Sequence, residues 1–190
     1  MLKSVTFRLC CVALLSALSI VCNVYSITIT PQNSISFVYI VAFMSGVFLG
    51  PVEGFAVGAI GDVIGCIISP KGPYAISVTL SSALMGVLFW AIFKMCKKMP
   101  VYGRIILGYL LVFIVCSVLI NTTTWYLIGS RESNYFVFLG TRNAFQSIIV
   151  AVNCLLTCLL YKSMSMIMGR FGFKPQTKKD KKADESTEAN

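Results

Sequence analysis

The chain alternates long apolar stretches with short polar segments. At about 1.5 Å of rise per residue, a helix needs roughly 20 apolar residues to cross a bilayer. Six stretches approach or reach this length and are predicted to be membrane helices: 9–25, 37–49, 55–68, 76–95, 105–128 and 136–166. The second and third are short and flank Gly-Pro-Val-Glu-Gly at 50–54, which predicts a tight reversal because Pro and Gly interrupt helices. One broken element over this pair is the alternative.

The composition places the whole chain in a membrane. Hydrophobic residues make up 57% of its 190 residues, charged residues make up 12%, and the mean hydropathy is +0.82. Such a chain has too few polar side chains to cover a water-facing surface. We therefore predict an all-α integral membrane protein with one six-helix membrane domain over residues 1–173. Residues 174–190 carry no large apolar side chain and are expected to form a disordered basic and polar cytoplasmic tail.

The basic residues predict the orientation. One side of the predicted bundle carries Lys3, Arg8, Lys94, Lys97, Lys98, Arg104, Lys162, Arg170 and the lysines of the tail. The opposite side carries only Lys71, Arg131 and Arg142. Since Lys and Arg accumulate on the cytoplasmic side, both termini are expected there. The net charge of +9 then reflects topology, and we expect no nucleic acid partner.

The residue types argue against catalysis. The chain has no His, which excludes a Ser-His-Asp triad, and no GxxxxGK[ST] loop for ATP. Its eight cysteines lie mostly within predicted helices without a CxxC pair, so neither a metal nor another cofactor is expected. These absences favour a binding protein over an enzyme.

Asp62 is the one acidic residue well inside a predicted helix. An intramembrane carboxylate costs roughly 3 kcal/mol on insertion scales, so it must face protein or water. The structural interpretation is that it accepts hydrogen bonds from neighbouring Ser and Thr residues. Ligand contact and proton coupling are the alternatives.

Polar and aromatic side chains gather in the outer half of the predicted bundle, where they are costly unless they converge on a cavity. We select as ligand-binding candidates Asn33, Ser36, Phe37, Lys71, Tyr74, Thr79, Ser81, Asn121, Trp125, Arg142 and Gln146. Arg142 begins a polar stripe that continues through Gln146 and Asn153 at helical spacing. Tyr74 and Trp125 have an alternative role as anchors at the membrane surface. The helical Ser and Thr side chains also have an alternative role, in which they form hydrogen bonds to the backbone of their own helix.

Small residues recur at helical spacing on two helices. Gly54, Gly58, Gly61 and Gly65 form a stripe that is expected to pack against other helices of the chain. Ala13 and Ala17 lie four residues apart on the first helix. Their face either packs within the chain or docks another subunit.

Several of these motifs together resemble a known family. They are Gly50-Pro51 through Gly58, Asp62 and Gly65, then Pro70 to Tyr74, Thr79-Leu80-Ser81, Asn121-Thr122 with Trp125, and Arg142. The chain resembles the substrate-binding S components of energy-coupling factor vitamin transporters, most closely the folate type, up to about Lys162. It departs from the family at Ser77-Val78 and in lacking a basic residue at 31–33.

The resemblance implies a six-helix bundle in the bacterial cytoplasmic membrane that holds a vitamin near its outer face. It also implies a transmembrane coupling subunit, docked through Ala13 and Ala17, and two cytosolic ATPases. Aromatic side chains would stack a pterin ring, and Arg142 or Lys71 would meet a carboxylate. We expect an S component for folate. The alternatives are another vitamin or precursor, or a stand-alone proton-coupled transporter that uses Asp62.

Overall fold

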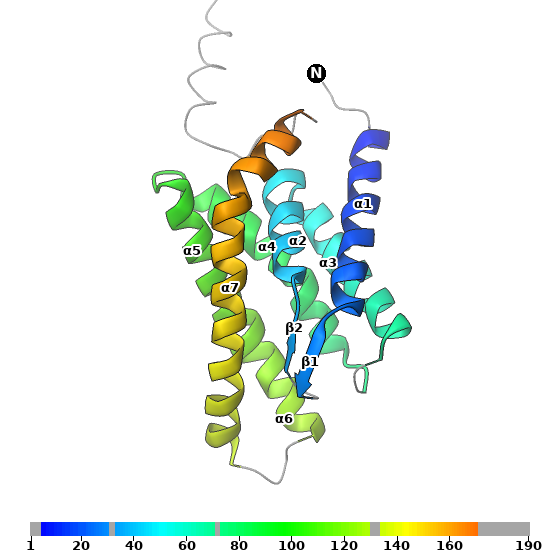
Figure 1. Cartoon of the computed structure of the whole chain (residues 1–190), viewed down its shortest axis with the longest axis vertical. Helices are drawn as coiled ribbons and strands as arrows, with labels where there is room; N and C mark the ends of the chain where they lie inside the picture. Colours follow the sequence, from blue (N-terminus) through cyan, green and yellow to red (C-terminus); the bar gives the residue numbers. More distant parts are fainter. Residues whose placement is uncertain (1–4, 31–32, 71–72, 130–133, 171–190) are drawn as a thin grey trace, which may run out of the picture.

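The computed structural model describes residues 5–30, 33–70, 73–129 and 134–170, which form a bundle of helices along one axis (Figure 1). In chain order the elements are α1 (Val5–Val24), β1 (Ile27–Thr30), β2 (Asn33–Ile35), α2 (Val38–Met44), η1 (Ser45–Leu49), α3 (Pro51–Ile68), α4 (Ile76–Met95), α5 (Val101–Val112), η2 (Phe113–Thr122), α6 (Thr123–Gly129) and α7 (Tyr135–Arg170). The segments η1 and η2 are π-helical and continue the α-helices before them.

The helices confirm the all-α membrane fold. Within the part of the chain that the structure describes, five helices are long and apolar enough to cross a bilayer: Thr6–Val24, Pro51–Ile68, Ile76–Met95, Val101–Ile128 and Tyr135–Arg170. Val38–Leu49 is a shorter apolar helix. The six predicted stretches therefore all form helices, in the predicted order. The predicted tail, residues 174–190, lies outside the described residues and stays a prediction.

The reversal between η1 and α3 is tighter than predicted. Gly50 alone turns the chain, at a φ of 131° that only glycine adopts without strain. Pro51 then begins α3, because the first turn of a helix leaves its amides without helical partners and proline lacks one. The expected helix start at Phe55 was therefore too late.

Glycines set the distance between η1, α3 and α4. A Cβ added to Gly46 would lie 2.1 Å from the Gly86 carbonyl oxygen, and one added to Gly86 would lie 2.7 Å from the Gly54 carbonyl carbon. On α3, Gly58 lies equally close to the α4 backbone, and Gly61 lies against Ser19 of α1. The predicted packing role of the α3 glycine stripe is confirmed.

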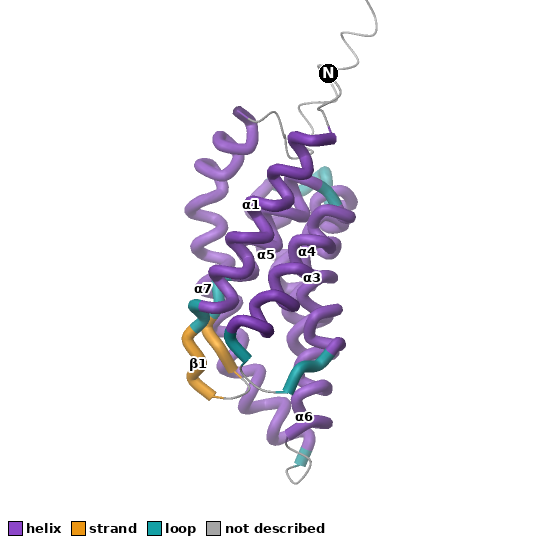
Figure 2. The backbone as a smooth tube through the Cα atoms, turned by 90° about the vertical axis from the view of Figure 1, so that its right-hand side faces the viewer, coloured by secondary structure: helices purple, strands orange, loops and turns teal. Residues whose placement is uncertain are grey.

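The two ends of the bundle differ in the elements that they hold. The start of α1 and the end of α7 lie together, as an even number of crossings requires, and the β1–β2 hairpin and α6 lie at the opposite end (Figures 1 and 2). The antiparallel hairpin, with Ile27 opposite Ile35, was not predicted. We call the end with the hairpin and α6 the outer end, following the predicted orientation.

α1 lies at the edge of the bundle and is attached to α3 near both of its ends. Arg8 forms an ion pair with Glu53 and donates to the Leu49 carbonyl at 3.1 Å. Near the other end of α1, the Asn23 amide donates to the Gly61 carbonyl at 3.5 Å. Between these two contacts, Leu15, Ser16 and Ser19 are buried against the bundle, whereas the opposite side of α1 is exposed.

Candidate ligand-binding site

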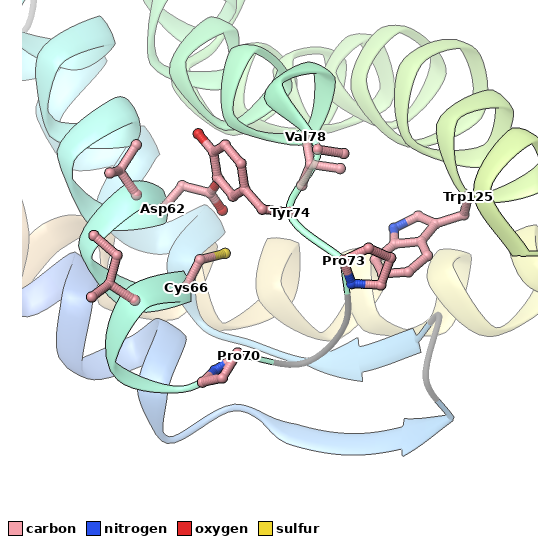
Figure 3. Close-up of a pocket in the computed structure, with 10 residues that line it drawn as sticks. Asp62, Cys66, Pro70, Pro73, Tyr74, Val78 and Trp125 are labelled. Carbon is pink, nitrogen blue, oxygen red and sulfur yellow. The ribbon is translucent and has the colours of Figure 1, made fainter.

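A cavity of about 310 Å³ opens at the outer end, between α3, the start of α4 and α6. We call it the slot. Its lining residues are Asp62, Val63, Cys66, Ile67, Pro70, Pro73, Tyr74, Ala75, Val78 and Trp125. Figure 3 shows Asp62 and Cys66 on α3, with Trp125 on the far side and Pro73 and Tyr74 between them. The flat faces of Pro73, Tyr74 and Trp125 suit an aromatic ring as ligand.

Asp62 forms the polar corner of the slot. It is 8% exposed and accepts hydrogen bonds from the Thr79 hydroxyl at 2.7 Å, the Ser82 hydroxyl at 3.4 Å and the Asn23 amide at 3.5 Å. These donors come from α1 and α4, so one carboxylate joins three helices. The structure thus confirms the expected hydrogen bonds from neighbouring Ser and Thr residues, and it also places Asp62 where a ligand can reach it.

A second polar group lies deeper, where α7 faces η2 and α2. We call it the Arg142 cluster; its members are Arg142, Thr122, Ser117, Tyr39, Gln146 and Asn143. The Arg142 guanidinium is 7% exposed and donates to the Thr122 hydroxyl at 2.8 Å. The Gln146 amide donates to the Tyr39 hydroxyl at 2.7 Å, and that hydroxyl lies 3.3 Å from the Ser117 hydroxyl. A cationic donor and several neutral polar groups are thus held together inside the bundle.

Two buried side-chain atoms, one in this cluster and one in the residue before Thr122, have no hydrogen-bond partner among the described residues. They are the Asn121 side-chain oxygen and the Asn143 side-chain nitrogen. A buried polar atom left unpaired costs about 1–3 kcal/mol. Each of these two amide groups keeps an unused hydrogen-bonding atom.

The structure brings six of the predicted binding residues to these two places. Tyr74 and Trp125 line the slot, and Thr79 bonds Asp62 at its edge. Arg142 and Gln146 belong to the Arg142 cluster, and Asn121 lies beside it. Lys71 lies outside the described residues, and for Asn33 the structure gives the backbone of β2 only.

Three predicted residues lie elsewhere. Ser36 donates to the Cys22 carbonyl at 3.2 Å and accepts from the Val38 amide, so it joins the hairpin to α1 and α2. Phe37 is exposed just before α2. Ser81 is buried and donates to the Cys116 carbonyl at 3.3 Å, between α4 and η2. Their predicted role in binding stays a prediction, and these contacts account for Ser36 and Ser81 without a ligand.

Tyr39, Ser117 and Thr122 were not selected from the sequence. Ser117 and Thr122 lie in η2, where π-helical i→i+5 bonding makes each turn wider than the 3.6 residues of an α-helix. Residue spacing therefore misassigns which side chains share a face. The run of polar residues at 121–124 was the available signal, but it does not say which of them points toward α7.

Ala13 and Ala17 lie on the exposed side of α1, away from α3. Ser16 and Ser19 take the buried side instead. The small face is therefore not used for packing within the described chain, which leaves it accessible to a partner helix.

Three findings relate the chain to known proteins. Residues 7–161 match the family described as the ECF transporter, substrate-specific component. The folate transporter FolT of Clostridium novyi (strain NT) is 30% identical over 138 residues, which cover 73% of this chain and 76% of that protein. The crystal structure of FolT bound with folic acid is similar with a TM-score of 0.66 and 25% identity, and the match covers 78% of this chain and 88% of the other.

Proposed function

Because this chain belongs to the substrate-specific components of ECF transporters, we propose that it binds folate at the outer end of its bundle for import into the cell. Family membership makes it a multi-pass membrane protein that binds a transport substrate. The family consists of transport proteins, which confirms the prediction that the chain is not an enzyme.

The observation that carries the folate proposal is that one continuous helical segment, η2 and α6, carries both Thr122 of the Arg142 cluster and Trp125 of the aromatic slot. Folate joins a flat pterin ring to a flexible tail that ends in carboxylates. Tyr74 and Trp125 offer faces for the ring, and Asn121 and Asn143 offer amide groups for its polar edge. Arg142 supplies the positive charge that a carboxylate needs. The name of the FolT relative and the folic acid in the similar structure support the same ligand.

We further propose that the chain works with a transmembrane coupling subunit and two cytosolic ATPases, in a bacterial cytoplasmic membrane. Its sequence has no phosphate-binding loop of its own, so another subunit must supply the energy of ATP. The exposed face around Ala13 and Ala17 gives a coupling helix a surface for close approach.

Titration of the purified protein with folic acid tests the ligand. Binding is measured by calorimetry, and tryptophan fluorescence locates it, since the chain has only two tryptophans. Trp125 lines the slot, whereas Trp90 lies near the other end of α4, beside Lys94. We expect Trp125→Phe to remove most of the fluorescence change and Trp90→Phe to preserve it. A protein that binds no folic acid but co-purifies with a different vitamin contradicts the folate assignment.

Uptake measurements test the partners. Import into cells that express the chain is expected only when the coupling subunit and ATPases are present. Uptake by the chain alone, abolished by a protonophore and by Asp62→Asn, would establish the stand-alone proton-coupled transporter instead.

A further inference from the structure

A chain of three side chains connects Asp62 to the surface of the slot. The Thr79 hydroxyl donates to Asp62 Oδ2 at 2.7 Å, and the same Thr79 oxygen lies 2.8 Å from the Tyr74 hydroxyl. Asp62 is buried, whereas Tyr74 is 54% exposed and lines the slot. The hydrogen bonds therefore run from a buried carboxylate to a half-exposed residue that lines the slot.

The number of protons available in this series of hydrogen bonds determines whether the Tyr74 hydroxyl donates or accepts. A threonine hydroxyl has one proton to donate, and here that proton is directed to Asp62. Toward Tyr74 the Thr79 oxygen can then only accept, so the Tyr74 hydroxyl must donate to it. Only the lone pairs of the Tyr74 oxygen remain for a molecule in the slot, and they accept hydrogen bonds but cannot donate.

We propose that Asp62 is a positioning residue of the ligand site, which acts through Thr79 to orient the hydroxyl of Tyr74. The slot then favours a ligand that brings an N–H or O–H group to Tyr74. This inference rests on the proposed function for its ligand, and it gives the buried carboxylate a role besides joining helices. Asp62 has two further donors, Asn23 and Ser82, both on its other oxygen, Oδ1, so the oxygen that serves Thr79 is separate from them.

A double-mutant cycle tests the proposal. Tyr74→Phe is expected to weaken folic acid binding about three- to tenfold, the loss of one hydrogen bond. Asp62→Asn and Thr79→Val are each expected to produce part or all of this loss in the native background. Neither should weaken binding further when combined with Tyr74→Phe, because the connection that runs from Asp62 through Thr79 to Tyr74 is then already removed. Thr79→Ser, which keeps the hydroxyl, is expected to restore the binding that Thr79→Val loses.

Ser82→Ala is the matched control, since it removes a hydrogen bond to Asp62 outside this chain of side chains. It is expected to leave the affinity for folic acid unchanged. Additive losses for Asp62→Asn and Tyr74→Phe would show that Asp62 acts on the fold or contacts the ligand directly, and an equal loss in Ser82→Ala would show that it acts through the fold. Either result would overturn the proposal.

The failure of the folate proposal gives a different result. In that case the unmodified protein itself does not bind folic acid. The cycle is then measured by the melting temperature of the ligand-free protein. Coupled losses between Asp62 and Tyr74 support the connection through Thr79, and additive losses overturn it.

Discussion

Replacing Arg142 by glutamine removes one buried positive charge with little change in packing. Arg142 is 7% exposed and donates to Thr122 at 2.8 Å, and a glutamine amide can also donate to that hydroxyl. The variant is therefore expected to fold. A charge-assisted hydrogen bond to a ligand carboxylate contributes about 1.5–3 kcal/mol. Its loss corresponds to about a ten- to hundredfold weaker binding of folic acid.

Titration with two ligands shows whether Arg142 contacts the glutamate end or the pterin end of folic acid. Folic acid is compared with a pterin that lacks the glutamate, and only folic acid should lose affinity in Arg142→Gln. Arg170→Gln is the matched control, because it makes the same change at the exposed far end of the same helix. An equal loss for both ligands would refute the carboxylate assignment and place Arg142 at the pterin or in the shape of the site. Unchanged binding of both would remove Arg142 from the site.

Three further predictions concern packing, docking and stacking. Gly46→Ala places a Cβ 2.1 Å from the Gly86 oxygen and should destabilise the protein by about 1–3 kcal/mol, seen as a lower melting temperature. Gly140→Ala on α7 meets nothing within 4 Å and should be neutral or slightly stabilising; a similar loss in both variants contradicts the packing argument. Ala17→Trp should preserve folic acid binding but reduce co-purification with the coupling subunit, and unfolding of the isolated chain would instead assign Ala17 to internal packing. Trp125→Ala should weaken folic acid binding by about 0.5–1.5 kcal/mol more than the loss of buried apolar surface alone accounts for, whereas Trp125→Phe should retain part of the stacking energy. Equal losses of affinity in the two variants would exclude a stacking role.

The helices were predictable because the bilayer imposes a simple rule. A stretch such as 76–95 is mostly apolar and ends near the basic group that begins at Lys94, so the membrane environment alone indicates its bounds. The β1–β2 hairpin follows no such rule. The alternation Ile-Thr-Ile-Thr at 27–30 is typical of a strand, but it is as short as many loops. Only the pairing of this segment with β2 distinguishes a strand from a loop here.

The site was predictable by region and less so by residue. Asp62, Thr79 and Tyr74 lie in separate motifs, and nothing in their spacing indicates that one hydrogen-bonded chain joins them. That requires the crossing of α3 and α4, which depends on glycines meeting at the backbone. Thr122 was missed for another reason: the π-helical η2 rotates the faces of the helix relative to an α-helical count.

The contact between Gly46, Gly54 and Gly86 has a consequence for how the molecule can respond to its ligand. With no side chain between the three backbones, η1, α3 and α4 are in direct contact and cannot move closer together. Repacking of rotamers, by which most cores absorb a change of volume, is absent at this junction. Closure around a bound molecule is therefore expected at the opposite end, in the hairpin and in the segments that carry Tyr74 and Trp125. The contact between η1, α3 and α4 is thus a rigid region, and we expect the outer end of the bundle to accommodate a difference in size between two ligands.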